Sequence, residues 1–123
     1  MNDRKIRSTI EEGIATKQRF LAECLPSLVQ FCDLAVSTLR SGGKIMLCGN
    51  GGSSCDAAHA AGELVGWFEH KERRGYAAMA LGHQIPALTA IGNDAGFEHV
   101  FRREVEAIGK SGDLLVGITT SGG

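Results

Sequence analysis

The sequence predicts an α/β fold in which a parallel sheet lies between two layers of helices. Three short apolar runs, at residues 44–48, 76–81 and 114–118, are typical of buried strands. Segments with helical periodicity separate these runs, and a βαβαβ order forms parallel sheets with right-handed crossovers. Small polar loops at 49–53 and 119–123 follow two of the three predicted strands. Ligands of such sheets bind at the carboxyl ends of strands, so these loops are the first candidates for a site.

Two helices are predicted before the first strand. Pro26 suits the first turn of the second helix, which the glycine pair at 42–43 would end. We therefore expect two parts, N-terminal helices at 1–43 that serve oligomerisation and the start of an α/β domain at 44–123. The first helix, at 3–23, needs a partner surface for its apolar stripe, which is formed by Ile6, Ile10, Ile14 and Phe20 or Leu21.

The remaining elements follow from periodicity and from glycine. The turn at 49–53 leads into a helix predicted at 54–68. Residues 87–92 fit either a loop or a short helix. Residues 97–108 form a predicted helix that Gly109 ends.

Composition excludes several classes of function. The chain has 123 residues, with 13 Lys plus Arg and 14 Asp plus Glu, so its formal net charge is −1. This balance argues against binding to nucleic acid or to an anionic membrane. The apolar stretches are shorter than the ~18 residues of a membrane span, and the charged N-terminus lacks the apolar core of a signal peptide. We expect a cytoplasmic protein whose cysteines, at 24, 32, 48 and 55, are reduced.

The glycine-rich loop after the first predicted strand is a candidate anion site. Glycines let backbone N–H groups approach an anion, and the helix N-terminus that follows adds positive potential. A tight turn with nothing bound is the alternative. The loop is not a dinucleotide fingerprint, because Ser54 stands where its third glycine is required, and no P-loop motif is present. Ser53 and Ser54 offer hydroxyl donors beside the backbone N–H groups.

Three further groups of polar side chains are candidates for catalysis or ligand binding. His59 and Glu63 are four residues apart on the predicted helix, so they lie on the same face. They could serve as metal ligands or as an acid/base set, and a surface pair without function is the alternative. The hydroxyls of residues 119–121 form a second phosphate cradle or an exposed loop. Asn93 and Asp94 fit a turn and the N-cap of the next helix.

Taken together, these motifs resemble the sugar isomerase (SIS) domain family, and within it the phosphoheptose isomerases. The resemblance runs from about residue 40 to 123 through Cys-Gly-Asn-Gly-Gly-Ser at 48–53, Asp-Ala-x-His at 56–59 and Glu-Leu-x-Gly-x-Phe at 63–68. It continues through Thr-Ala-Ile-Gly-Asn-Asp-x-Gly-Phe at 89–97, Gly-Asp-x-Leu-x-Gly-Ile at 112–118 and Thr-Ser-Gly at 120–122. It implies a three-layer αβα, flavodoxin-like SIS sheet, of which this chain holds the first three strands.

The resemblance also implies an activity. Sedoheptulose 7-phosphate would become D-glycero-D-manno-heptose 7-phosphate through an enediolate, in the synthesis of lipopolysaccharide core or another glycan. Glu63 would be the catalytic acid/base, and His59 and Glu63 would hold one zinc ion, with the other ligands beyond Gly123. The implied assembly is a homotetramer. The implied substrate contacts are Asn50, Gly51, Gly52, Ser53, Glu63, Asn93, Asp94, Thr119, Thr120 and Ser121.

The chain departs from this family in length. Family members continue past the loop at 119–123, and the missing part would carry a Gln and a His that complete the site. We therefore expect a longer native protein, and we expect the 123-residue chain alone to be inactive. Thr119 stands where Ser is more usual and keeps the hydroxyl. The alternative function is a non-catalytic SIS protein that binds a phosphosugar or a partner such as the replication initiator DnaA, and Glu63 favours the enzyme.

Overall fold

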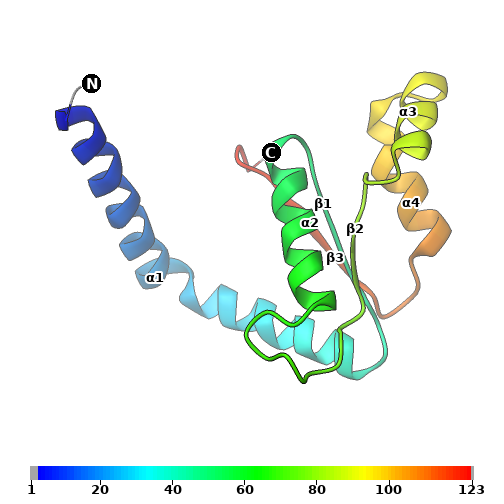
Figure 1. The fold of residues 1–123 in the computed structure, drawn as a ribbon, viewed down its shortest axis with the longest axis horizontal. Helices are drawn as coiled ribbons and strands as arrows, with labels where there is room; N and C mark the ends of the chain where they lie inside the picture. The colour runs from blue at the N-terminus through cyan, green and yellow to red at the C-terminus, as the bar shows by residue number, and fades with distance from the viewer. Residues whose placement is uncertain (1–2, 123) are drawn as a thin grey trace. The chain divides into compact units, whose positions relative to one another are not determined.

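The computed structural model describes residues 3–122 and contains a three-stranded parallel sheet in the order β2-β1-β3 (Figure 1). The strands are β1 (Ile45–Gly49), β2 (Ala78–Ala80) and β3 (Leu114–Ile118). The helices are α1 (Asp3–Arg40), α2 (Gly52–Val65), α3 (Ile85–Asp94), the 3-10 turn η1 (Phe97–His99) and α4 (Val100–Ile108). The predicted fold class and its three strands are confirmed. The two predicted parts, 1–43 and 44–123, begin and end at Met1 and Gly123, and these two residues lie outside the described range.

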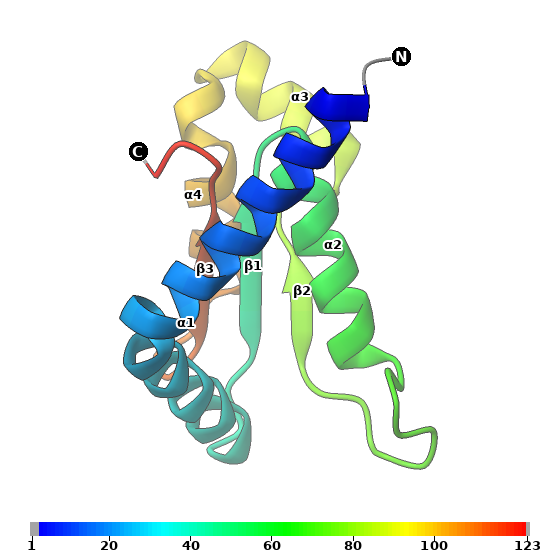
Figure 2. The ribbon, with the colours of Figure 1, turned by 90° about the vertical axis from the view of Figure 1, so that its left-hand side faces the viewer.

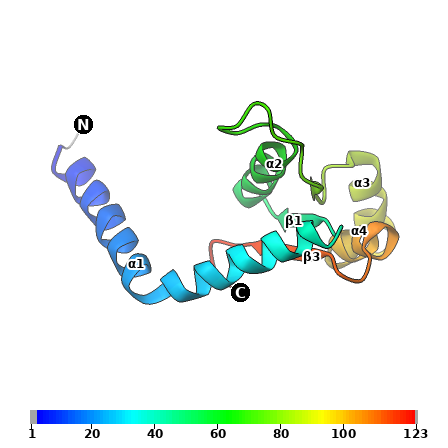
Figure 3. The same cartoon turned by 90° about the horizontal axis from the view of Figure 1, so that it is seen from below.

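The central strand pairs with both neighbours in register. Ile45 lies opposite Ala78 of β2 and Leu114 of β3, and Figure 2 shows β1 between them. Side chains alternate across a strand, so β1 contributes to both faces of the sheet. Ile45 and Leu47 pack on one face against Ala57 and Ala61 of α2. Met46 points to the face that α4 covers, and Figure 3 shows α2 and α4 on opposite sides of the strands.

The chain divides into two compact units, residues 1–34 and 35–123. The first is the larger part of α1, and its apolar stripe is exposed: Ile6, Ile10 and Ile14 each keep about half of their surface in contact with solvent. The second holds the last turns of α1, where Ala35 and Leu39 pack on the core of the sheet.

The prediction of two N-terminal helices is wrong, because α1 is one helix that contains Pro26. Proline removes one hydrogen bond of a helix and bends it, but it need not end the helix. Apolar residues at helical spacing on both sides of Pro26 allow the helix to continue past it. Figure 1 shows α1 changing direction in its light-blue part. The segment that fitted either a loop or a short helix is helical, as α3.

The expectation about membrane spans also needs correction. An 18-residue window of α1 reaches a mean hydropathy of 1.3, and by length and composition alone this helix is long and apolar enough to cross a membrane. Core helices of water-soluble proteins meet the same criterion, so one such helix is weak support for a span. The exposed apolar stripe of α1 equally suits a helix that packs on another protein surface.

A buried carboxylate joins the starts of β1 and β3. Asp113, whose side chain is 6% exposed, accepts hydrogen bonds from Lys44 N at 2.9 Å and Lys110 N at 2.7 Å, and it pairs with Lys44 Nζ. The Lys44 ammonium and these backbone donors lower the pKa of Asp113 to about 2. The structure thus holds the carboxylate in its charged form down to low pH.

We expect this contact to make stability pH-dependent. The folded-state pKa lies below the value of about 3.9 in the unfolded chain, so the contribution is present above pH ~4 and is lost as the pH falls toward ~2. Urea unfolding at a series of pH values should show this loss in the wild type. It should be absent in Asp113→Asn and retained in the exposed control Asp33→Asn. Parallel curves for wild type and Asp113→Asn would contradict the prediction.

Candidate functional site

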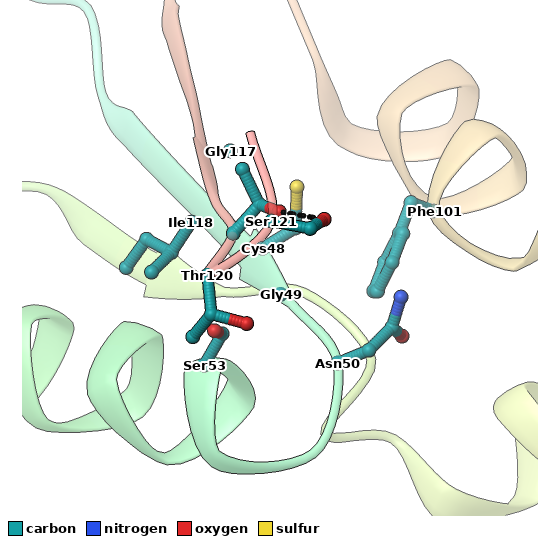
Figure 4. A pocket seen from close by; sticks show the side chains of 10 residues that line it. Cys48, Gly49, Asn50, Ser53, Phe101, Gly117, Ile118, Thr120 and Ser121 are labelled. Carbon is teal, nitrogen blue, oxygen red and sulfur yellow. Dashed lines mark hydrogen bonds between the residues drawn. The ribbon is translucent and has the colours of Figure 1, made fainter. Parts of the chain in front are cut away.

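The loops after β1 and β3 line one cavity of about 470 Å³ at the carboxyl edge of the sheet (Figure 4). The parallel topology explains this, since β1 and β3 are adjacent and end on the same side. Side chains predicted as substrate contacts therefore meet although they are about 70 residues apart in the sequence. The lining residues are Cys48, Gly49, Asn50, Ser53, Phe101, Gly117, Ile118, Thr119, Thr120 and Ser121.

The glycine loop takes a shape that other residues would strain. A Cβ on Gly49 would lie 2.7 Å from backbone and side-chain atoms of Ser53, so the strand can turn into α2 this tightly only with glycine. Gly51 has φ 57°, a conformation that side chains disfavour, and it is the N-cap of α2. No side chain caps α2, and its first turn has no acidic residue. The N-terminus of α2 therefore keeps its positive potential for an anion.

The opposite wall of the cavity carries hydroxyl groups. Thr119 Oγ1 and Ser121 Oγ are hydrogen-bonded at 3.2 Å, and Gly122 N–H donates to Thr119 Oγ1 at 3.3 Å. Figure 4 shows Thr120 and Ser53 near the start of α2, with Asn50 and Phe101 across the opening. Among the described residues, no Lys or Arg lines the cavity. An anion bound here would be held by neutral hydroxyl and amide donors.

The described residues that line the cavity also bring no negative charge. Burial raises the pKa of the Cys48 thiol, so this thiol stays protonated and neutral at pH 7. The remaining lining side chains are hydroxyl, amide or apolar groups. Nothing among the lining residues repels a phosphate.

His59 and Glu63 form the expected pair on α2. His59 Nε2 lies 3.3 Å from Glu63 Oε1, and the two side chains are 77% and 43% exposed. Two ligand atoms bound to one tetrahedral zinc ion at about 2.1 Å are about 3.4 Å apart, so the pair fits two of its four ligands. Among residues 3–122, no group of three or more His, Cys, Asp or Glu side chains gathers at one point. Within residues 3–122, the structure therefore shows a His–Glu pair and no complete metal site.

Glu63 lies far from the glycine loop, at the other end of α2. It is in the last turn of α2, ten residues after Ser53, which corresponds to about 15 Å along a helix axis. Neither Glu63 nor His59 lines the cavity. The phosphate cradle and the acid/base candidate are therefore separate features of this chain.

Asn93 and Asp94 are also placed differently from the prediction. Both belong to the last turn of α3, and neither caps the next helix, because Gly96 precedes η1 and His99 precedes α4. Asn93 Nδ2 donates to Asp94 Oδ1 at 2.8 Å, and neither residue lines the cavity. Helical periodicity continued through Asn93 and Asp94 and overrode their preference for turns.

Sequence reasoning missed two residues near the site. Phe101 of α4 forms one wall of the cavity, and its ring lies where a Cβ on Gly82 would be placed. His83 Nε2 lies 3.1 Å from Ser54 Oγ, which connects the loop after β2 to the first turn of α2. Phe101 was recognisable as an apolar residue of a helix. No sequence signal indicated that α4 would place it against the loop after β1.

Comparisons with known proteins agree with this architecture. A model of the SIS domain matches residues 10–123. The phosphoheptose isomerase of Roseiflexus sp. (strain RS-1) is 49% identical over 113 residues, which are 92% of this chain and 57% of that protein. The phosphoheptose isomerase of Neisseria gonorrhoeae (strain NCCP11945) is 48% identical over 118 residues, 96% of this chain and 59% of that protein.

Two solved structures have the same fold. Phosphoheptose isomerase GmhA from Neisseria gonorrhoeae matches with a TM-score of 0.85 at 42% identity, over 95% of this chain and 60% of that one. A phosphoheptose isomerase from Francisella tularensis matches with a TM-score of 0.92 at 36% identity, over 98% and 63%. The chain therefore spans somewhat less than two thirds of the length of these relatives. With the glycine loop, the hydroxyl loop and the parallel sheet all in place, the chain belongs to the SIS domain family.

Proposed function

We propose that the whole protein is a phosphosugar isomerase that converts sedoheptulose 7-phosphate to D-glycero-D-manno-heptose 7-phosphate. The observation that carries the proposal is the cavity at the carboxyl edge of the sheet, lined by uncharged donors from two loops. A donor-rich, concave site next to a helix N-terminus suits a sugar phosphate. The similarity to phosphoheptose isomerases supports a seven-carbon sugar phosphate as the substrate.

The substrate would enter with its phosphate toward the hydroxyl loop. Thr119, Thr120 and Ser121 would donate to the phosphate oxygens, and the N-terminus of α2 adds its dipole. Asn50 and Ser53 remain available for sugar hydroxyls. Gly51 and Gly52 would let the backbone approach the sugar closely.

Glu63 would carry the proton transfer. Its carboxylate would take a proton from C1 of the ketose, which gives the enediolate. The O1 proton would pass to O2, and Glu63 would return its proton to C2, which leaves the aldehyde at C1. Because Glu63 lies about 15 Å along α2 from Ser53, it would act on a substrate held partly by the rest of the protein or by a second copy. A homotetramer joined through the exposed stripe of α1 is the assembly that we propose.

Zinc is part of this proposal. His59 and Glu63 would provide two ligands, since their atoms have the separation that a tetrahedral ion requires. When bound, a divalent ion polarises a carbonyl and stabilises enediolate oxygens.

Asn93 and Asp94 lie outside the cavity, so they would contact substrate only where another part of the assembly approaches α3. We further propose a cytoplasmic enzyme without nucleic-acid or membrane partners, whose product feeds heptose-containing glycans such as lipopolysaccharide core.

Replacing Thr120 by valine tests the phosphate cradle, because valine has the same shape and lacks the hydroxyl. A hydrogen bond to a charged group contributes about 1.5–3 kcal/mol, so we expect KM for sedoheptulose 7-phosphate to rise roughly 10- to 100-fold. The inhibition constant of inorganic phosphate should rise in parallel. Thr89→Val, on the exposed face of α3, is the matched control and should change neither value.

Two outcomes would contradict these assignments. A Thr120→Val variant with wild-type affinity for phosphate would remove the hydroxyl loop from the phosphate site. A folded wild-type protein that binds phosphosugar but does not isomerise it would reject the enzyme in favour of a phosphosugar- or partner-binding SIS protein.

A further inference from the structure

The segment between α2 and β2 folds back against the end of α2, and Arg73 holds it there. Arg73 Nη1 donates to the carbonyl of Leu64 at 2.9 Å, and Nη2 donates to the carbonyl of Glu63 at 2.5 Å. Nη1 also reaches the carbonyl of Arg74 at 3.2 Å. One guanidinium group therefore contacts two consecutive carbonyls in the last turn of the helix.

These carbonyls need partners from outside the helix. The last four C=O groups of an α-helix have no intrahelical donor, and the C-terminus carries a partial negative charge. The last turn of α2 contains no basic residue of its own. From the loop, Arg73 supplies a donor to the carbonyl of Glu63, a further donor to that of Leu64, and the positive charge that this helix end lacks.

The guanidinium is itself held in place. It lies over the ring of Tyr76, with Cζ 4.5 Å from the ring centroid, and Tyr76 N–H donates to the carbonyl of Leu64 at 2.9 Å. A Cβ on Gly75 would lie 2.6 Å from the carbonyl oxygen of Val65, which shows how closely the returning chain approaches the helix end. Arg73 is half-buried by these contacts.

We propose that Arg73 is the positioning residue for Glu63. This role rests on the proposed function, in which Glu63 carries the proton transfer. Arg73 touches neither the carboxylate nor the phosphate cavity, and it binds the backbone carbonyl of Glu63 itself. It thereby holds the last turn in helical geometry, which keeps the Glu63 carboxylate 3.3 Å from His59 Nε2.

This role requires the guanidinium group of arginine. The group is planar and has several N–H groups in fixed directions, which form a fork, so it can donate to two carbonyls while it stacks on a ring. A lysine ammonium keeps the charge but is a single point with no planar face. Loss of the fork would let the last turn fray, and a displacement of about 1 Å in a reacting group costs up to about 10²-fold in rate.

The test compares Arg73→Lys, Arg73→Met and the control Arg74→Met in the whole protein. Arg74 is the neighbouring arginine and is exposed. We expect both Arg73 variants to lose about 10²-fold in kcat for sedoheptulose 7-phosphate. KM and inhibition by inorganic phosphate should stay at wild-type values, because the phosphate cradle is at the other end of α2. Amide hydrogen exchange at residues 62–66 should become faster in both variants and remain unchanged in Arg74→Met.

Each alternative result has a distinct meaning. A wild-type kcat in Arg73→Lys would show that charge alone suffices and would overturn the positioning role. Unchanged amide exchange at 62–66 in Arg73→Met would show that Arg73 does not hold the helix end, which also overturns it. A wild type without isomerase activity rejects the proposed function, and the exchange measurement then still decides whether Arg73 holds the end of α2.

Discussion

Glu63→Gln is expected to reduce kcat for sedoheptulose 7-phosphate by about 10²–10⁴-fold, the usual contribution of a general acid/base. This corresponds to about 3–5 kcal/mol of activation free energy at ~1.4 kcal/mol per tenfold change. Glutamine keeps the shape of the side chain and one hydrogen-bonding oxygen, but it cannot accept the proton. The Glu63 side chain is 43% exposed and its contact is the pair with His59, so the free energy of unfolding should change by no more than ~0.5 kcal/mol.

The measurement is the steady-state rate in the whole protein, with thermal unfolding recorded on the same preparations. Glu72→Gln, an exposed glutamate in the loop after α2, is the control for loss of one negative charge. A Glu63→Gln variant with near wild-type kcat would contradict the role of this carboxylate. A large loss of stability would show instead that Glu63 is required for folding.

His59→Ala is expected to lower zinc affinity strongly. Removal of an outer-shell partner of a metal ligand costs about 10–100-fold in affinity, and removal of a ligand itself should exceed this. The geometric reason is the 3.3 Å separation of His59 Nε2 from Glu63 Oε1, which fits two corners of a tetrahedral zinc site.

Zinc content after dialysis against a metal buffer checks this prediction in the whole protein. His70→Ala is the matched control, because His70 is an exposed histidine outside α2. Equal zinc content in wild type and His59→Ala would remove His59 from the ligand set. Zinc loss in His70→Ala to the same extent would show that the effect is not specific to α2.

Local sequence signals were sufficient for the strands and for most helices. The apolar run at 44–48 became the central strand because its side chains fill both faces of the sheet, which leaves Ile45, Met46 and Leu47 buried. Gly109 ends α4 as expected. The predictions failed where a residue is compatible with two local structures. Pro26 suits a helix start or a bend within a helix, and Asn93 with Asp94 suits a turn or the end of a helix. In both cases the apolar periodicity of the surrounding residues decided the structure.

The sequence by itself determined the three strands, the tight glycine turn before α2 and the pairing of His59 with Glu63, since all three depend on neighbours within a few residues. Only the tertiary structure decided which distant groups meet. Strand order brings the loop after β3 to the loop after β1, and packing of α4 adds Phe101. The length of α2 separates Glu63 from that cavity, and the returning loop brings Arg73 to its backbone. These relations follow from how the elements pack, which no short stretch of sequence encodes.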